Sequence, residues 1–386
     1  MKTSTLKLLS FGILLIFSMS NLRADHIVGS DITYTCGDTA GIYNITYNFY
    51  RDCNGCYVLG QTPNCGTGQD CNSSFTAPTA LTVSCISGSS ATSAGTINLT
   101  RTGIVDITPT CGADRSRCEQ PCNGAFPYGI EKHTFTGRVD LRSNIKSGCC
   151  DFEISVRLSV RSVGITTGQR SQTFYTSCEI NACQAPCNNS PTLSNDPVAI
   201  LCCNQPYTFN NGAIDVDRDS ISYSFAQAFR GQGQPCTYSG NRTYLDPLTT
   251  YYPGRLKWPY CNAQANPPIG TCLDAETGDI VFTPTSCSEV GVVVIQITEW
   301  RKDSLGVYKK IGTTRRDMQF IVMTCPDNNA PEVKGPYSYN VCEGDQLCFN
   351  VETDDKVYIP PPPALPAAPD TVTNSWNRGI PGATYT

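Results

Sequence analysis

Twenty-three cysteines in 386 residues constrain this chain more than any other feature of its sequence. Disulfides form and persist in oxidising compartments and are rare in the cytosol, so this density is typical of an exported protein. The spacings do not match a zinc framework, because Cys53–Cys56 forms a CxxC but no second CxxC follows at zinc-ribbon distance. We therefore expect structural disulfides, and the odd count leaves at least one cysteine without a partner in the chain.

Two pairs of adjacent cysteines, Cys149–Cys150 and Cys202–Cys203, indicate how some of these disulfides are arranged. Neighbouring residues of a strand point to opposite faces of the sheet. Each pair is therefore expected to send its two sulfurs to different partners, since a ring between neighbours strains the disulfide geometry. Near the end of the chain, Cys342 and Cys348 are expected to join two short strands by a disulfide.

Residues 1–24 have the pattern of an export signal. Lys2 and Lys7 form the positive region, an apolar run covers 8–17, and Ala24 closes a candidate cleavage site. The apolar run is too short to span a bilayer, and no later segment predicts a membrane helix. We expect a protein secreted to the outer cell surface, with no membrane span in this chain.

The charge balance excludes one class of function. The formal net charge is -5 at pH 7, and it becomes more negative once Lys2, Lys7 and Arg23 leave with the signal. Nucleic-acid binding needs basic patches, so no nucleic-acid partner is expected. Charged residues make up only 16% of the chain, which favours a β-rich secreted protein over a helical cytosolic enzyme.

Apolar and polar residues alternate with a period of two through much of the chain, a pattern that predicts strands with one buried face. The alternation is clearest over 25–36, 41–50, 151–163 and 290–300, and the last two strands of the second module are expected over 307–312 and 317–323. No helical stripe of useful length appears. We predict an all-β fold of tandem antiparallel β-sandwich modules, Ig-like or cadherin-like, stapled by disulfides.

Turn-rich segments divide the chain into modules. We predict a Cys-rich N-terminal β-sandwich domain over 25–187, a cadherin-like or Ig-like β-sandwich domain over 188–326 and, over 327–386, the start of a third, truncated β-module with a Pro-rich insertion. On the strand over 151–163, Arg157 and Arg161 fall on the polar face, where charged residues of antiparallel sheets are normally solvated.

An acidic turn holds Asp215, Asp217 and Asp219 between two predicted strands. Carboxylates this close repel one another unless a hard cation lies among them, and calcium takes about six to eight oxygens from such turns. An EF-hand is excluded, because strands flank the turn and the glycine and glutamate of that loop are missing. The three aspartates are a candidate calcium site, and a solvated turn bonded to its own backbone is the alternative. Asn188 and Asn189 mark a junction where calcium could also bind.

A long connection over 230–272 is crowded with aromatic residues. Its candidate ligand-binding residues are Tyr251, Tyr252, Trp258 and Tyr260. Exposed rings on a loop stack on sugar rings or on peptides, so surface glycans or other surface proteins are the expected partners. The alternative is that the rings cover the core of the module, in a loop cross-linked through Cys236 and Cys261.

The sequence carries no catalytic motif of the commonest hydrolases. G-x-S-x-G and H-E-x-x-H are absent, and His26 and His133 are the only histidines. His133 lies on a predicted strand, where a cross-strand contact is expected rather than a role as a base. We expect no enzyme; the alternative is a secreted carbohydrate-binding protein or the accessory modules of a secreted hydrolase, because a glycosidase needs only two well-placed carboxylates.

Several segments resemble large surface proteins of gliding Bacteroidetes. DHIVGSDITYTC and NFYRDCNG resemble the start of those proteins, and NGAIDVDRDSISYSF with CLDAETGDIVFTPT is similar to their cadherin-like and Ig-like repeats. The resemblance implies an adhesin-like protein of the gliding-motility-associated, type IX secreted family, with Asp215, Asp217 and Asp219 as a calcium site. From it we expect a non-catalytic structural or adhesion protein, the N-terminal part of a longer repeat array involved in surface adhesion or gliding.

Overall fold

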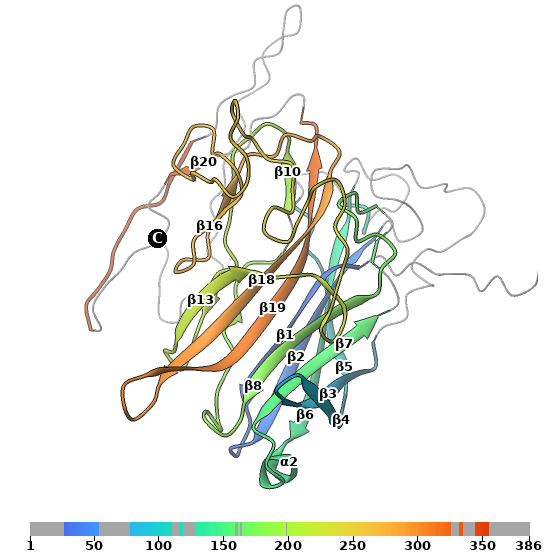
Figure 1. Ribbon diagram of the computed structural model, residues 1–386, viewed down its shortest axis with the longest axis vertical. Helices are drawn as coiled ribbons and strands as arrows, with labels where there is room; N and C mark the ends of the chain where they lie inside the picture. Colours follow the sequence, from blue (N-terminus) through green and yellow to red (C-terminus); the bar gives the residue numbers. More distant parts are fainter. Residues whose placement is uncertain are drawn as a thin grey trace, which may run out of the picture.

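The computed structural model describes residues 27–53, 78–109, 116–118, 128–158, 161–162, 164–197, 199–325, 332–334 and 344–354. Over these residues the fold is all-β, which confirms the all-β class expected from the alternation (Figure 1). The helix α2 (Arg142–Lys146) is a single turn between two strands. Among the described residues, no helix is both long enough and apolar enough to cross a membrane.

The strands follow the chain in two groups. The first group is β1 (Ile27–Cys36), β2 (Ile42–Asp52), β3 (Ala80–Ser87), β4 (Ser90–Asn98), β5 (Thr100–Asp106), β6 (Ile130–Asp140), β7 (Asp151–Leu158) and β8 (Phe174–Asn181). The second group is β9 (Thr192–Leu193), β10 (Ala199–Cys202), β11 (Tyr207–Phe209), β12 (Ala213–Ile214), β13 (Ser220–Phe225), β14 (Phe229–Gly231), β15 (Gln234–Pro235), β16 (Cys272–Leu273), β17 (Ile280–Phe282), β18 (Val290–Lys302), β19 (Tyr308–Met323), β20 (Glu332–Lys334) and β21 (Glu352–Asp354).

Most of these strands join one 14-stranded sheet, whose main path is β4-β3-β7-β8-β19-β1-β2-β6-β5. Strand β2 shows how the sequence builds it: Tyr43, Ile45, Tyr47 and Phe49 occupy alternate positions and are all buried on one face. The pairs are antiparallel except for β10, which runs parallel to β19. The smaller sheets have the strand orders β11-β17-β16, β12-β9 and β20-β21.

Strand β19 lies at the centre of the sheet and has several partners. Along one edge it pairs with β18 in a long hairpin. Along the other edge it meets β8 at 312–314, β1 at 316–317 and β10 at 320–323. The expectation of two separate strands over 307–312 and 317–323 is wrong, because the structure has one continuous strand there. β18 and β8 supply partners across 313–316, so β19 continues without a break. A strand from the second half of the chain therefore pairs with two strands of the first half, one after the other along one of its edges.

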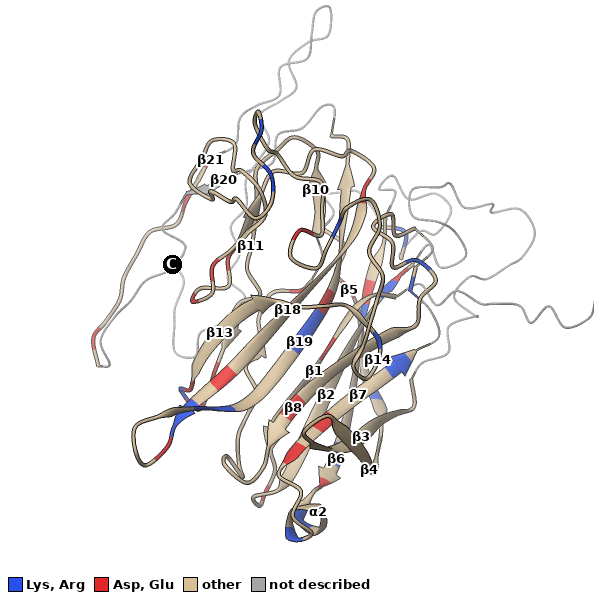
Figure 2. Ribbon diagram, in the orientation of Figure 1, with Lys and Arg blue, Asp and Glu red and all other residues tan. Residues whose placement is uncertain are grey.

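Buried charged residues lie where β19 crosses β1, and Figure 2 shows basic and acidic bands on β19 at this level. Arg161 donates to both carboxylate oxygens of Asp317, at 2.8 and 2.6 Å, and the two side chains are 0% and 2% exposed. Next to them, Nε of Arg316 lies 3.3 Å from Oδ2 of Asp31, another buried carboxylate. These pairs join residues of the two halves of the chain.

The expectation of a solvated basic face holds for Arg157, which is exposed, but it is wrong for Arg161. Arg161 lies beyond the end of β7, in an isolated bridge with Ile27 that places it inside the junction. Its guanidinium also lies 4.5 Å from the centre of the Phe174 ring. A buried arginine needs such partners, because an unpaired charge in the interior is very costly.

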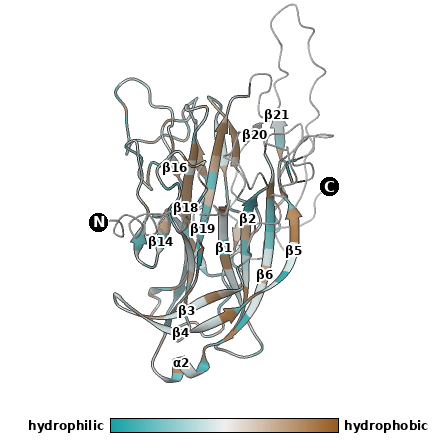
Figure 3. Cartoon of the chain, turned by 90° about the vertical axis from the view of Figure 1, so that its right-hand side faces the viewer, coloured by the Kyte–Doolittle hydropathy of each residue, from teal (hydrophilic) through white to brown (hydrophobic). Residues whose placement is uncertain are grey.

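The two largest hydrophobic cores are built from different halves of the chain. The first is built from strands β1–β8, and residues such as Tyr47, Phe135 and Phe152 fill it. The second surrounds the stacked rings of Phe282 and Phe320. Hydrophobic stretches run along β18 and β19 in Figure 3. These two cores thus follow the two halves of the chain, whereas a third core packs Tyr128 and Ile165 against Val290, Val292 and Val294. The strand pairing also crosses from one half to the other.

Seven disulfides join the described residues: Cys36–Cys187, Cys53–Cys118, Cys85–Cys149, Cys150–Cys183, Cys202–Cys325, Cys203–Cys287 and Cys261–Cys272. They confirm that each adjacent pair of cysteines sends its sulfurs to different partners. The expected link between Cys236 and Cys261 is wrong: Cys236 is a buried thiol beside Arg161, and Cys261 bonds to Cys272. Of the predicted pair Cys342–Cys348, Cys348 is exposed and Cys342 lies outside the described residues.

Candidate functional site

The predicted acidic turn lies between β12 and β13. Oδ1 of Asp215 accepts hydrogen bonds from the main-chain N–H groups of Asp217 and Asp219, at 2.9 and 3.1 Å, and so closes the turn. Arg218 adopts φ of 64°, in the left-handed region that a non-glycine residue rarely occupies. The local sequence therefore folds as an aspartate-closed turn, and this leaves the other oxygen of Asp215 for a different partner.

A third carboxylate comes from a distant strand. Oxygen atoms of Asp215, Asp219 and Glu299 lie within 4.8 Å of one another, and Glu299 is a fully buried residue of β18. Asp217 is not in this cluster, because its two oxygens accept hydrogen bonds from the main-chain N–H and Nδ2 of Asn189, each at 2.8 Å. The structure thus places Asp215 and Asp219 of the predicted trio together, and adds a glutamate that the sequence analysis missed.

Glu299 is held by buried polar groups. Its carboxylate accepts hydrogen bonds from Nδ2 of Asn188 at 2.6 Å and from the hydroxyl of Tyr34 at 3.2 Å. Gly312, across the strand pair, leaves room for this arrangement, because a Cβ there would lie 2.5 Å from both Oε2 of Glu299 and the Tyr34 hydroxyl. The glutamate, the asparagine and the tyrosine come from three parts of the chain, so the site forms only in the complete fold.

Arg301 supplies the neighbouring positive charge. Its Nε and Nη2 donate to the two oxygens of Asp219 at 2.7 and 2.6 Å, and Nη2 also donates to Oδ1 of Asn188 at 2.7 Å. Among the described residues, Oδ2 of Asp215 is buried without a hydrogen-bond partner. Buried polar atoms are nearly always paired, so a bound ion would supply the partner that this oxygen lacks. The donor set is all oxygen, which suits a hard cation such as Ca²⁺.

The titration of Glu299 gives a testable prediction. Burial raises the pKa of Glu299 to about 8, with the hydrogen bond from Asn188 opposing the rise and Asp215 adding to it. An unfolded glutamate has a pKa of about 4.3, so between these values the folded protein holds a proton that the unfolded chain has lost. With a chelator present, the free energy of unfolding should therefore fall as pH rises from about 5 to about 8. Urea denaturation across this range measures the slope.

Glu299→Gln is the control for this slope, because the amide keeps the shape of the side chain and does not titrate. The variant should show a flatter dependence of unfolding free energy on pH. An identical slope in the parent and in Glu299→Gln would show that other groups cause the dependence.

The four predicted aromatic residues separate into two kinds of environment. Trp258 and Tyr260 are 42% and 44% exposed and lie just before the segment that the Cys261–Cys272 disulfide closes. Tyr251 and Tyr252 are half-buried, and the main-chain N–H of Tyr251 donates to Thr283. The surface available for stacking in this loop is thus that of Trp258 and Tyr260.

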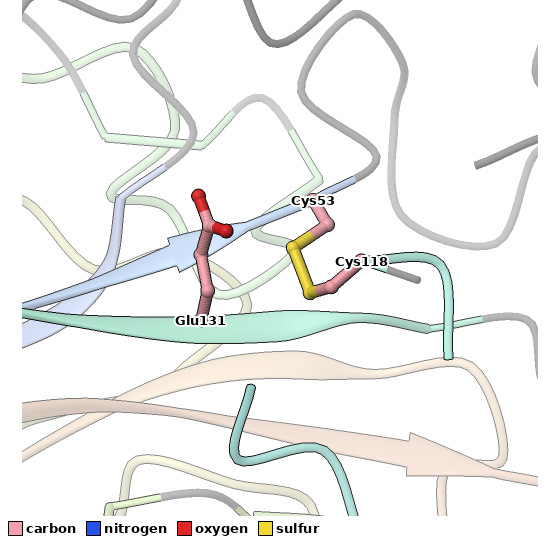
Figure 4. A group of neighbouring side chains, drawn as sticks. All are labelled: Cys53, Cys118 and Glu131. Atoms are coloured by element: carbon pink, nitrogen blue, oxygen red, sulfur yellow. A yellow bond between two sulfur atoms is a disulfide. The ribbon is translucent and has the colours of Figure 1, made fainter. Parts of the chain in front are cut away.

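A second group of metal-binding residue types lies at the end of β2. Figure 4 shows that the sulfurs of Cys53 and Cys118 are bonded to each other beside Glu131, so they are not available to a metal. The carboxylate of Glu131 instead meets Arg51 at 2.7 Å and Nε2 of His133 at 2.8 Å. His133 is buried, and its ring meets the edge of Phe49 on the paired strand β2, the cross-strand contact expected for a histidine on a strand.

Comparison of the chain with protein-family models, with curated proteins and with solved structures finds no match.

Proposed function

We propose that this chain is an exported, non-catalytic surface protein that projects or attaches at the outer cell surface. The observation that carries the proposal is the covalent bracing of an all-β fold: the Cys36–Cys187 and Cys202–Cys325 disulfides bridge 151 and 123 residues of chain. Disulfides at this density favour an extracellular or oxidising environment. A fold braced in this way resists unfolding outside the cell, which an attachment protein requires.

The finer assignment is part of the same proposal. The two hydrophobic cores support an origin in two fused Ig-like or cadherin-like β-sandwich modules, which share strand β19. The resemblance to gliding-motility-associated, type IX secreted adhesins supports a place at the N-terminal end of a longer repeat array. Surface glycans or other surface proteins are the proposed partners.

An attachment assay tests this function. Beads coated with the oxidised protein should adhere to surfaces carrying glycans or extracellular proteins, whereas beads coated with the reduced and alkylated protein should not. The same preparation should release no product from polysaccharide or peptide substrates. Turnover of any of these substrates would overturn the non-catalytic assignment, and equal adhesion of the two preparations would show that the fold is not responsible.

A carbohydrate-binding protein, or the accessory modules of a secreted hydrolase, is the second candidate. The exposed rings of Trp258 and Tyr260 favour it, since aromatic faces stack on sugars. Adhesion of the beads to glycan surfaces alone, lost when Trp258 is replaced by alanine, would favour this candidate over attachment to proteins.

We further propose that Asp215, Asp219 and Glu299 hold a calcium ion. The support is the unpartnered Oδ2 of Asp215 and the distance of 4.8 Å or less between the three carboxylates. Bound calcium would neutralise their mutual repulsion and fix the turn before β13 against β18. Arg301 already binds both oxygens of Asp219, so in the bound state this residue would share its oxygens between the arginine and the ion.

Calcium should raise the free energy of unfolding of the parent protein by about 2.7 kcal/mol when present at 100 times its dissociation constant, because it binds only the folded state. Asp215→Asn and Glu299→Gln should abolish this response. Asp217→Asn is the matched control and should keep it, because the Asp217 carboxylate lies outside the cluster. Thermal unfolding with calcium and with a chelator measures the effect. A parent protein that shows no response to calcium would remove the site.

A further inference from the structure

A cavity of about 310 Å³ opens beside the β18–β19 hairpin, next to the carboxylate cluster, with which it shares Asp219. Its lining combines two aromatic residues, Trp300 and Tyr308, with three basic ones, Arg218, Arg301 and Lys302. Asp219 is its acidic residue. Small-molecule sites in proteins are concave and have volumes from about 300 Å³ upward, so this cavity suits one or two sugar-sized units rather than a folded partner.

The lining carries an excess of positive charge. Asp219 and Arg301 form a two-pronged ion pair, at 2.7 and 2.6 Å, and so compensate each other. Lys302 and Arg218 are exposed residues of the lining and add two further positive charges to it. Figure 2 shows basic residues at this end of β18, in a chain whose net charge is -5. The cavity therefore favours an anionic ligand against the charge of the whole protein.

The aromatic walls are held in place. Nε1 of Trp300 donates to Oγ of Ser222 at 2.8 Å, which fixes the orientation of the indole. Tyr308 is 51% exposed, and Nζ of Lys302 lies 5.0 Å from the centre of its ring. A hydrogen bond with Ser220 lowers the pKa of Tyr308, and the charge of Lys302 adds to this effect. The indole of Trp300 is thus held in place, and the ring of Tyr308 lies directly beside a cation.

We propose that this cavity binds an acidic sugar, a pyranose ring that carries a carboxylate or a sulfate. The ring stacks on Trp300 and Tyr308, and the anionic group meets Lys302 and Arg218. An acidic peptide would use the cations and leave the aromatic walls without a flat partner, whereas a sugar ring uses both. The inference deepens the proposed attachment role, on which it rests, by naming the class of glycan that the protein binds.

Calorimetric titration with four probes tests the inference. Tetragalacturonate supplies carboxylates, sulfated maltotriose supplies sulfates, maltotriose is the neutral sugar, and tetraglutamate is the acidic peptide. At least one of the first two should bind, and which of them binds identifies the anionic group. Lys302→Gln and Tyr308→Ala should each weaken this binding about tenfold, the loss of one charged or stacking contact. Both side chains are exposed, so both variants should fold.

Lys309→Gln is the matched control, because Lys309 is an exposed lysine of the same hairpin that does not line the cavity. It should bind within about twofold of the parent, as expected of a surface charge away from the contact. The inference is overturned if neither anionic sugar binds, if maltotriose or tetraglutamate binds as tightly, or if Tyr308→Ala binds as well as the parent. If no acidic sugar binds but the beads still adhere, the attachment role stands and the sugar site falls. If an acidic sugar binds but the beads do not adhere, the sugar site stands and the attachment role falls.

Discussion

Asp317→Ala should lower the free energy of unfolding by about 3–5 kcal/mol, because it leaves a buried guanidinium without its partner. Arg161 and Asp317 are 0% and 2% exposed and share two hydrogen bonds, so solvent cannot replace the lost carboxylate. The pair also joins the two halves of the chain, so the loss should reduce the stability of both cores together. Urea denaturation monitored by tryptophan fluorescence and by circular dichroism measures the change.

The control for this prediction is Asp38→Ala. Asp38 pairs with Arg138 at 2.8 Å, but both side chains are more than half exposed, and such pairs contribute about 0–1 kcal/mol. A double variant, Arg161→Met with Asp317→Leu, removes both buried charges and should recover most of the stability that Asp317→Ala loses. An equal, small effect of Asp317→Ala and Asp38→Ala would show that the buried pair does not hold the halves together.

Removal of the Cys36–Cys187 disulfide, by replacing both cysteines with serine, should lower the free energy of unfolding by about 5 kcal/mol. The disulfide closes a separation of 151 residues and so restricts the unfolded chain strongly. It also anchors the segment that carries Asn188 and Asn189, so the variant should lose part of its calcium response. Denaturation of oxidised samples with and without calcium measures both effects.

Cys261–Cys272 supplies the comparison, because it closes a separation of only 11 residues. The same substitution there should cost about 3 kcal/mol, since the restriction of the unfolded chain grows with the logarithm of the loop length. The difference between the two losses of unfolding free energy measures the effect of loop length more directly than either loss alone. If the loss of Cys261–Cys272 costs as much as the loss of Cys36–Cys187, then the long link does not act through the unfolded chain.

The alternation of residues was enough to place most strands, because burial of one face depends on local sequence alone. The predicted strand at 41–50 corresponds to β2 (Ile42–Asp52), and the predicted strand at 290–300 to β18 (Val290–Lys302). The two adjacent cysteine pairs also followed from local geometry, since the pleat alone sends neighbouring sulfurs apart. Local sequence was therefore enough to predict the all-β class and part of the disulfide pattern.

The missed features depend on contacts between distant residues. Asp215 and Asp219 stand out in the sequence, but Glu299 is a single acidic residue in an apolar strand, and only the β13–β18 pairing brings it to the turn. That one unexpected charge in the run 290–300 was the signal that could have identified it. Arg161 appeared to continue an alternating strand, and nothing local indicates that Asp317 lies opposite.

The positions of two disulfides determine how the protein responds to tension. A pull applied between residues 27 and 325 passes along 27–36, crosses to Cys187, follows 187–202 and crosses again to Cys325. Once β1 has been peeled from β2 and β19, this short covalent route bears the force. The strands from β2 to β8 lie outside the route, whereas Asn188 and Asn189 lie on it and bond to Glu299 and Asp217. Tension along the route would therefore act on the acidic turn while those strands keep their shape.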